Sequence, residues 1–588
     1  MNGNKGRLVR SNRLLYRKFS QYLVPTMITY AALSLNDFVD SMVVSNLLGS
    51  GAMAVVNLGL PAMMVMSAAY ALLGTGGETA YAIAVGKRDR DSAGKYFTGA
   101  VTAAFIIGFA LLLLGVLFSS SFAGILCSDR ELLVPFRKYL FVTLLSAPLM
   151  VVTLTVLSFL PAAGYPGITT TVNVISNVIN ITMDFVYIRV FHMGVEGAAW
   201  ATFTGYVCAA LILAGALLTG KVKMYVSRDV KASLARLKEV LKFGSTDAAN
   251  QIGLSAQFAV CNRLAMAAAG TGGVVAYSLC LQSSGVMTVF LGAMMGSSVP
   301  MLAILHGQRD YHGEEGIRNT ALIGTLITTV TGTILFIAFA SPIALIYNIT
   351  DPAQHEMAVT ALRIYSLLYI PRYTVIILYQ YLKVIGLNRY STIMSALDSF
   401  AAVIPVALIM VSLKGITGLW AAFPLTACML LTAMIMINLR IASRSGGRLK
   451  GPLLTESDEE GSKPVLDVTI EKNSAEIAGI SEELQRICED MGMDKKKAAL
   501  TALAVEEIAV NAAARKDQSV YSDLLVRIHG GRVEIDFRSL GKAFDPLEED
   551  DGVIEENIAI LRSMASGIEN EYLMGMNSTR ITLGERKV

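Results

Sequence analysis

The chain has 588 residues, of which 54% are hydrophobic and only 16% are charged. Because soluble domains carry about 25% charged residues, this composition excludes an ordinary soluble protein. The net charge of +3 is small, and no nucleic-acid partner is expected. Apolar runs of roughly 20 residues, each long enough to cross a bilayer, recur between residues 21 and 438. They predict about twelve transmembrane helices.

A basic N-terminus, residues 1–18, precedes a first span that is too long and too polar for a signal peptide. Pro25 removes a backbone hydrogen bond from this span, and we expect a hinge there. Asn36, Asp37 and Asp40 follow, and the two acids lie three residues apart on roughly one side of the helix. The first span therefore brings two carboxyl groups into the membrane.

Basic residues concentrate in the even-numbered loops, and the opposite loops are short and nearly uncharged, apart from a basic segment near Arg137. The even-numbered loops contain Lys87, Arg88, Arg90 and Lys95, then Lys221, Lys223, Arg228, Lys231, Arg236, Lys238 and Lys242, then Arg309 and Arg318. By the positive-inside rule, both termini are cytoplasmic and the number of spans is even. We expect a multi-pass protein of the plasma membrane.

The fifth predicted span carries a row of polar residues. Asn173, Asn177, Asn180 and Asp184 are spaced 4, 3 and 4 residues apart, which places them on one helical face. An aspartate inside a bilayer costs about 2.5–3.5 kcal/mol by insertion scales, so this face is expected to meet a wet cavity; interhelical hydrogen bonding is the alternative for the asparagines. No basic residue within the first or fifth span is placed to neutralise Asp40 or Asp184. Such a carboxyl group tends to hold a proton, which suits an ion-coupling site.

Two pairs of turns predict an internal repeat. The turns GKRD at Gly86 and GQRD at Gly307 lie 221 residues apart (307 minus 86). The turns GVEG at Gly194 and GITG at Gly415 have the same offset (415 minus 194). Because each half then holds an even number of spans, the halves form a parallel repeat. The predicted fold class is an all-α membrane protein of twelve helices in two parallel six-helix repeats, followed by a C-terminal α/β sandwich domain.

The expected domains are the basic N-terminus at 1–18, an N-terminal six-helix lobe at 19–220, a cytoplasmic linker at 221–244, a C-terminal six-helix lobe at 245–440, a second linker at 441–463 and a soluble domain at 464–588.

The second lobe has Asp247, Arg263, Arg372, Lys383 and Asp398 in or near spans. These residues could line the cleft, pair with each other or lie at membrane edges. The six cysteines show no CxxC spacing, so we interpret them as packing residues and expect no metal site.

Residues 15–440 resemble the multidrug and toxic compound extrusion (MATE) transporters. The resemblance rests on Asn36-Asp37-Phe38-Val39-Asp40-Ser41, on Asn180-Ile181-Thr182-Met183-Asp184, and on the Gly194 turn with the residues that follow it to Thr202. It implies export of amphipathic, often cationic, organic compounds driven by H⁺ or Na⁺. In prokaryotic members the positions that match Asp40, Asn180, Asp184 and Thr202 form a cation site. Tyr139 matches a neighbouring cavity position and Pro25 a bend, and Asn36, Asp37, Asn173 and Asn177 are further candidate cavity residues. The chain departs from the family in Ser45, where glycine is usual, and at residues 160–164, where a basic residue is common.

The soluble domain is expected to contain a strand at 465–470, helices at 475–491 and 494–515, a hairpin formed by 524–529 and 533–537, a helix near 556–565 and a last hairpin that ends at residue 583. Glu507 and Asn511, four residues apart on one helix face, resemble a box of anti-sigma-factor serine kinases and histidine-kinase ATPase domains. In those families the Glu acts as a base and the Asn holds Mg²⁺.

A second nucleotide box is only partly preserved. The segment from Gly541 to Asp545 resembles it, but Ser539 stands where the family has an aspartate that would bind the adenine amine, and residues 555–560 lack the glycine-rich lid. We therefore favour a degenerate, regulatory domain over a working kinase.

The leading hypothesis is a secondary antiporter, not an enzyme, that exports small organic compounds in exchange for H⁺ or Na⁺ and requires no cofactor. It is expected to be a monomer in the lipid bilayer, and a cytoplasmic regulatory protein could bind its tail. Two alternatives remain: a membrane-anchored sensor with serine-kinase activity, and a lipid-linked precursor flippase of the wider superfamily.

Overall fold

The computed structural model describes residues 10–126, 130–347, 349–457, 464–471, 473–515, 517–529, 532–544, 562 and 565–583. The chain divides into two compact units. A helical unit contains residues 21–442 and 451–454, and a second unit contains residues 1–20, 443–450 and 455–588.

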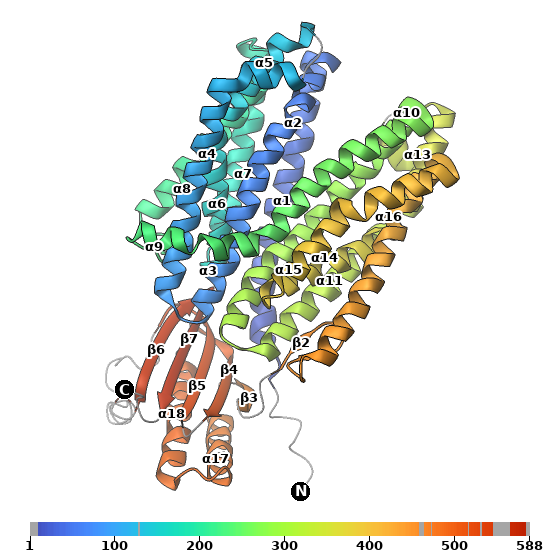
Figure 1. Ribbon diagram of the computed structural model, residues 1–588. Coiled ribbons are helices and arrows are strands. Elements are labelled where there is room, and N and C mark those ends of the chain that lie inside the picture. The colour runs from blue at the N-terminus through green and yellow to red at the C-terminus, as the bar shows by residue number, and fades with distance from the viewer. Residues whose placement is uncertain are drawn as a thin grey trace. The chain divides into compact units, whose positions relative to one another are not determined.

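The first half of the helical unit is a series of long helices (Figure 1). They are α1 (Arg13–Leu48), α2 (Ser50–Tyr70), the π-turn η1 (Ala71–Thr75), α3 (Gly76–Gly86), α4 (Arg90–Leu126), α5 (Arg130–Leu145), α6 (Ala147–Ala162), α7 (Pro166–Phe185), the π-turn η2 (Val186–Val190) and α8 (Val195–Leu218). A short helix, α9 (Val230–Ala235), lies in the segment predicted to link the two lobes.

The second half is again helical throughout its described elements. Its helices are α10 (Leu237–Gly307), α11 (Tyr311–Ala338), α12 (Ala340–Ile346), α13 (Pro352–Ser366), α14 (Tyr369–Val384), α15 (Asn388–Ala396), the π-turn η3 (Leu397–Ala401) and α16 (Val403–Arg444). The backbone leaves helical conformation inside α10 at Ala269 and Gly270, and inside α16 at Gly415. Each of these two long elements therefore contains a reversal between two helices.

Residues with positive φ recur at the predicted offset. Gly49 and Gly270 have φ values of 80° and 60° and lie 221 residues apart (270 minus 49). Arg88 and Arg309, with φ of 60° and 57°, have the same separation (309 minus 88). Gly194 and Gly415, with φ of 63° and 59°, repeat it a third time and also share ψ values of −146° and −140°. Since a left-handed backbone is uncommon and costly for most residues, matched turns of this kind reflect a common local path of the chain.

Helices of the two halves approach each other closely at the end that carries these charged turns. A Cβ atom placed on Gly86 would lie 3.0 Å from Cα of Gly307, and one on Gly307 would lie 2.9 Å from Cα of Gly86. From this end, near α3 and α15, the helices of the first and second halves diverge in Figure 1. Glycine is needed here because any side chain would separate the two backbones.

Seven described helical segments are long and apolar enough to cross a membrane by themselves. Two further pairs reach that length together, across bends of 42° between α5 and α6 and 41° between α13 and α14. The protein is thus mostly helical, with apolar helices suited to a membrane.

The second unit is built on a five-stranded antiparallel sheet in the order β3-β4-β5-β7-β6. The strands are β3 (Pro464–Glu471), β4 (Gln518–His529), β5 (Arg532–Gly541), β6 (Ala565–Leu573) and β7 (Met576–Leu583), and the helices are α17 (Ser474–Asp490) and α18 (Lys495–Ala514). Apolar side chains of both helices and of the sheet form one core.

These elements agree with the strand, the two helices and the hairpins predicted for residues 465–537 and for the C-terminal end. The helix expected near 556–565 falls mostly outside the described residues, and its last residue, Ala565, is instead the first residue of β6. The predicted linker at 441–463 contains the end of α16 and a small hairpin of β1 (Leu449–Lys450) and β2 (Thr455–Glu456).

Candidate ion-coupling site

Two predicted acids of the first half come together. Asp40 lies on α1 and Asp184 in the last turn of α7, and each carboxyl group interacts electrostatically with the other. The Tyr139 hydroxyl, from α5, interacts with both acids. The Asp184 side chain is fully buried, and Asp40 is half-buried. Residues almost 150 positions apart in the sequence thus form one polar cluster.

No cation neutralises this cluster among the described residues. Within the described part of the chain, neither oxygen of Asp184 has a hydrogen-bond partner, and Oδ1 of Asp40 is also buried without one. Two ionised carboxylates are both acceptors and cannot hydrogen-bond each other, whereas a shared proton would supply the missing donor. A small cation between them would have the same neutralising effect.

Amide groups next to the acids provide further polar atoms. The Nδ2 atoms of Asn177 and Asn180 and the Oδ1 atom of Asn36 are buried and have no partner within the described parts of the chain. Asn180 packs against α8, because a Cβ atom on Gly205 would lie 3.2 Å from its Cβ. Asn173 differs, since its Nδ2 donates to the carbonyl of Thr169 at 2.8 Å. The three unsatisfied amides are therefore available to a hydrated ion or a substrate.

The remaining predicted residues lie around this cluster in other arrangements. The Thr202 hydroxyl donates to the Ala198 carbonyl of its own helix at 3.1 Å. Asp37 is exposed and interacts with Asp40 and with Tyr206 of α8. Asp37 therefore interacts with the cluster through Asp40, whereas the Thr202 hydroxyl is hydrogen-bonded within its own helix.

Pro25 lies in an unbroken α1 that runs from Arg13 to Leu48, so the hinge stays a prediction. The Pro25 carbonyl accepts hydrogen bonds from Thr29 at 3.1 Å and from Thr170 of α7 at 2.8 Å. A hydroxyl group from the helix that bears Asp184 therefore fixes α1 at its proline.

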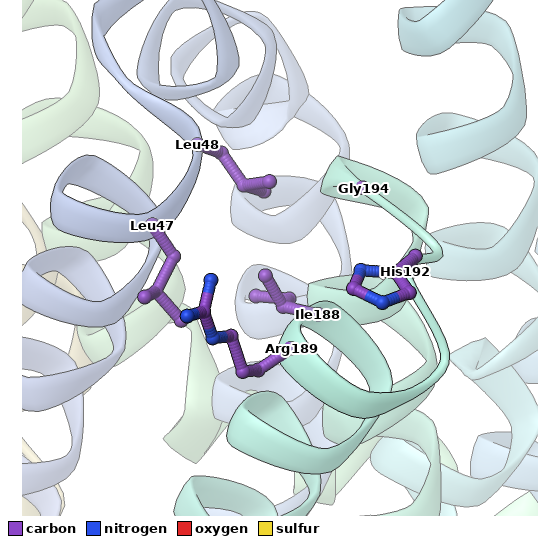
Figure 2. Close-up of a pocket in the computed structure, with 6 residues that line it drawn as sticks. All are labelled: Leu47, Leu48, Ile188, Arg189, His192 and Gly194. Atoms are coloured by element: carbon purple, nitrogen blue, oxygen red, sulfur yellow. The ribbon is translucent and has the colours of Figure 1, made fainter.

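A small cavity of about 170 Å³ lies where α1 ends and η2 turns (Figure 2). Leu47, Leu48, Ile188, Arg189, His192 and Gly194 line it. In Figure 2 the Arg189 guanidinium reaches toward Leu47 of α1. The Arg189 side chain thus lines this cavity together with the last residues of α1.

The polar residues of the second half form two ion pairs. Arg372 donates through Nε to both oxygens of Asp398, at 3.2 and 3.3 Å. Lys383 donates to Asp247 at 2.9 Å. From the sequence, pairing was one of three options, beside lining the cleft and lying at a membrane edge. The fifth residue of this group, Arg263, is exposed. Nothing in the sequence spacing could have matched these partners, which lie 26 and 136 residues apart.

The nucleotide-site residues of the second unit are only partly assembled. Glu507 is buried on α18, Asn511 is half-buried one turn later, and Gly541 ends β5. Asp545 lies outside the described residues.

At the position of the missing adenine-binding aspartate, the buried Ser539 donates to Oε1 of Gln518 at 3.1 Å. Asn577 donates to the same oxygen at 3.0 Å. This position is thus occupied by a hydrogen-bonded cluster of the protein itself.

Comparison with known proteins adds to this geometry. Residues 25–186 match the MatE family model. The Multidrug export protein MepA of Staphylococcus haemolyticus (strain JCSC1435) is 23% identical over 430 residues, which cover 72% of this chain and 94% of that protein. These matches support a MATE-family transporter.

Solved structures show that this chain shares the fold of MATE transporters. A crystal structure of MATE in complex with MaL6 aligns with a TM-score of 0.67 and 21% identity, over 72% of this chain and 96% of that one. An outward-facing conformation of a multidrug resistance MATE family transporter of the MOP superfamily aligns with a TM-score of 0.66 and 21% identity, with the same coverage.

Proposed function

We propose that this MATE-family transporter is a secondary antiporter that exports amphipathic or cationic organic compounds in exchange for H⁺ or Na⁺. The observation that carries the proposal is the pair of acids, Asp40 and Asp184, which face each other without a cationic partner in the described residues. Binding of one cation removes their repulsion and allows α1 and α7 to approach. Its release leaves two like charges that favour separation. The relative in Staphylococcus haemolyticus, named as a multidrug export protein, supports the substrate class.

The proposed architecture is twelve membrane helices in two parallel repeats, with both termini in the cytoplasm of a plasma-membrane monomer. The matched turns at an offset of 221 residues support the repeat. The basic even-numbered loops support the orientation. Two lobes of this kind can expose a central site alternately to either side.

The energy available from one ion is sufficient for such export. Moving one charge across 100 mV is worth about 2.3 kcal/mol. At 1.4 kcal/mol for each tenfold change, one ion could drive a concentration ratio of roughly fortyfold. No ATP is needed for this step.

The test is transport into proteoliposomes with a panel of organic cations, under a pH gradient and, separately, a sodium gradient. Asp40→Asn and Asp184→Asn are expected to abolish ion-driven transport, because an amide cannot gain and lose a proton and binds Na⁺ more weakly. Asp91→Asn is the matched control, since Asp91 is an exposed acid paired with Lys95. Full coupling in both site variants would refute the role of the acids. The gradient that drives transport identifies the ion.

We also propose that the C-terminal unit regulates transport and does not act as a kinase. Its edge strand, β3, binds the segment that precedes α1. The Arg10 N–H donates to the Asp467 carbonyl at 3.1 Å, and the Ser11 N–H donates to Thr469 Oγ1 at 3.0 Å. Because Asp40 lies farther along the same helix, a change in this segment can reach the coupling site through α1.

Charge strengthens the contact with the N-terminal segment. Arg10 is almost fully buried and lies 3.6 Å from a carboxylate oxygen of Asp467 and 3.5 Å from one of Asp523. Arg13 donates to the Tyr521 hydroxyl at 2.9 Å. A buried arginine held by two acids is a specific attachment, and losing it costs more than losing a surface pair.

A further inference from the structure

The helical unit contains a second polar cluster, which lies between its two halves. Asp247 of α10 accepts three hydrogen bonds: from Thr75 Oγ1 at 2.7 Å, from Gln380 Nε2 at 2.6 Å and from Lys383 Nζ at 2.9 Å. Thr75 belongs to the first half, and the other three residues belong to the second. The Thr75 hydroxyl therefore joins the halves directly.

The approach of the helices makes this bond possible. A Cβ atom on Gly76 would lie 2.5 Å from the backbone nitrogen of Gly244, so η1 and α3 meet α10 backbone to backbone. Thr75 lies next to Gly76, at the end of the π-turn η1. Such π-turns occur often at functional sites because they re-aim one residue out of the helical register. Asp247 lies one turn after Gly244, within reach of the hydroxyl.

The charges in this cluster do not balance. Asp247 and Glu78 of α3 both interact with Lys383, so two acids share one ammonium group. Lys383 and Gln380 are almost fully buried, whereas Asp247 and Glu78 are half-buried. The other titratable groups that face the two acids are Tyr30 of α1, Tyr70 of α2 and Tyr379 of α14. The tyrosines add no positive charge, so the shared lysine holds two acids from opposite halves together.

We propose that Thr75, Glu78, Asp247 and Lys383 form a latch that holds the two halves together at the Gly86–Gly307 end and must open once in each transport cycle. This inference rests on the proposed alternating access of the two lobes. Opening that end separates Thr75 from Asp247 and Glu78 from Lys383, because each pair spans the two halves. Gln380 and Lys383 remain with Asp247 within the second half, so its charge stays compensated when the latch is open.

The latch is tested by measuring the distance between the halves in the full-length protein. Nitroxide labels replace the exposed residues Lys87 and Arg389, one in each half, in a background that lacks native cysteines and still transports. Pulsed electron paramagnetic resonance then measures the distribution of distances between the two labels, and from it the fraction of molecules in which the labelled ends are apart. Because it replaces a hydroxyl with a methyl group, Thr75→Val is expected to raise the ratio of open to closed populations roughly tenfold.

Matched variants separate the latch from general damage. Thr79→Val is the control, because the Thr79 hydroxyl donates only to the Thr75 carbonyl of its own chain segment. Thr75→Ser keeps the hydroxyl and is expected to retain the parent distances. Glu78→Gln removes the acid that interacts with Lys383 across the halves and is expected to shift the population in the same direction as Thr75→Val. Unchanged distances in both Thr75→Val and Glu78→Gln would overturn the latch. Failure of the antiport proposal would appear separately, as absence of ion-driven transport in the parent protein.

Discussion

At the scale of single residues, the proposed coupling site depends on the lack of a described cation or hydrogen-bond donor around Asp184. A buried carboxyl group normally has a cation or several donors, because desolvated charge is expensive. Asp398 and Asp247 follow that rule, with Arg372 and Lys383 as partners. Among the described residues Asp184 has neither, and it interacts with Asp40 and the Tyr139 hydroxyl. The contrast within one protein separates a buried acid with no described cation beside it from buried acids that have a cationic partner.

The position of Tyr139 depends on a glycine in α2. A Cβ atom on Gly59 would lie 2.5 Å from Cε1 of the Tyr139 ring. Gly59→Ala is therefore expected to displace the ring from the two acids and to slow ion-driven transport roughly tenfold, the effect of about 1.4 kcal/mol. Initial rates in proteoliposomes measure this effect.

Gly51→Ala is the control for Gly59→Ala, because nothing lies within 4 Å of a Cβ atom at that position of the same helix. Alanine favours a helix over glycine by about 1 kcal/mol, so this control should fold at least as well as the parent. Equal transport rates in the two variants would contradict a role for the Tyr139 ring.

At the scale of elements, three strands of the C-terminal unit are joined by one buried acid. Asp536 of β5 accepts from Arg580 of β7 at 2.7 and 3.0 Å and from Arg527 of β4 at 3.3 Å. Burial by itself raises the pKa of Asp536, but the adjacent Arg580, with Arg538 and Arg527, outweighs it and holds this pKa below its usual value. The ionised form is therefore the one that the folded sheet stabilises.

The sign of the pH dependence follows from this lowered pKa. A lowered pKa in the folded state adds stability above the unfolded pKa of about 4. That stability is lost as the pH falls through the folded value. Asp536→Asn is expected to destabilise the unit by about 3 kcal/mol at pH 7 and to remove this part of the acid sensitivity.

Cys488 provides the measurement, because its thiol is fully buried in the core of this unit and burial raises its pKa to about 11. Full-length protein is equilibrated in urea at pH 7 and at about pH 3, below the unfolded pKa of an aspartate, and labelled with a disulfide reagent that reacts in acid. Mass spectrometry of the Cys488 peptide then gives the unfolded fraction. Glu483→Gln, which removes an exposed ion pair with Arg486, should leave the curves unchanged. If Asp536→Asn left the acid dependence of unfolding unchanged, ionised Asp536 would not be a source of the acid sensitivity of this unit.

At the scale of the whole molecule, the N-terminal segment connects the regulatory proposal to transport. Arg10→Ala removes the buried ion pairs with Asp467 and Asp523. The segment that precedes α1 is then bound less tightly to β3. The variant is expected to change the transport rate at least about twofold, the effect of roughly 0.4 kcal/mol, while the driving ion stays the same. Rates under imposed gradients measure this, and hydrogen exchange of β3 verifies release of the segment.

Arg17→Ala is the matched control for Arg10→Ala, because Arg17 is an exposed arginine of the same basic region. It should behave as the parent protein does in both measurements. A parent-like rate in Arg10→Ala, despite increased exchange of β3, would show that the C-terminal unit does not act through this segment.

Several features followed from the sequence because they depend on local pattern. The polar face of α7, with Asn180 and Asp184, follows from a helical period of 3.6 residues. The matched turns at Gly86 and Gly307 can be recognised in the sequence, because each has a glycine followed by charged residues after an apolar span. In the C-terminal unit, buried residues alternate along β3 at Leu466, Val468 and Ile470, a period-2 pattern that is local to the strand.

The sequence by itself determined the apolar helices, the offset of the matched turns and the polar residues inside predicted spans. Each of these features depends on spacing along the chain. Only the tertiary structure decided which acids remain without a cation and which are paired. Charge neutralisation depends on distances in space, and Lys383 reaches Asp247 across 136 residues while no described cation reaches Asp184. The approach of the halves at Gly86 and Gly307, and the Thr75–Asp247 hydrogen bond, likewise exist only when separate helices pack together.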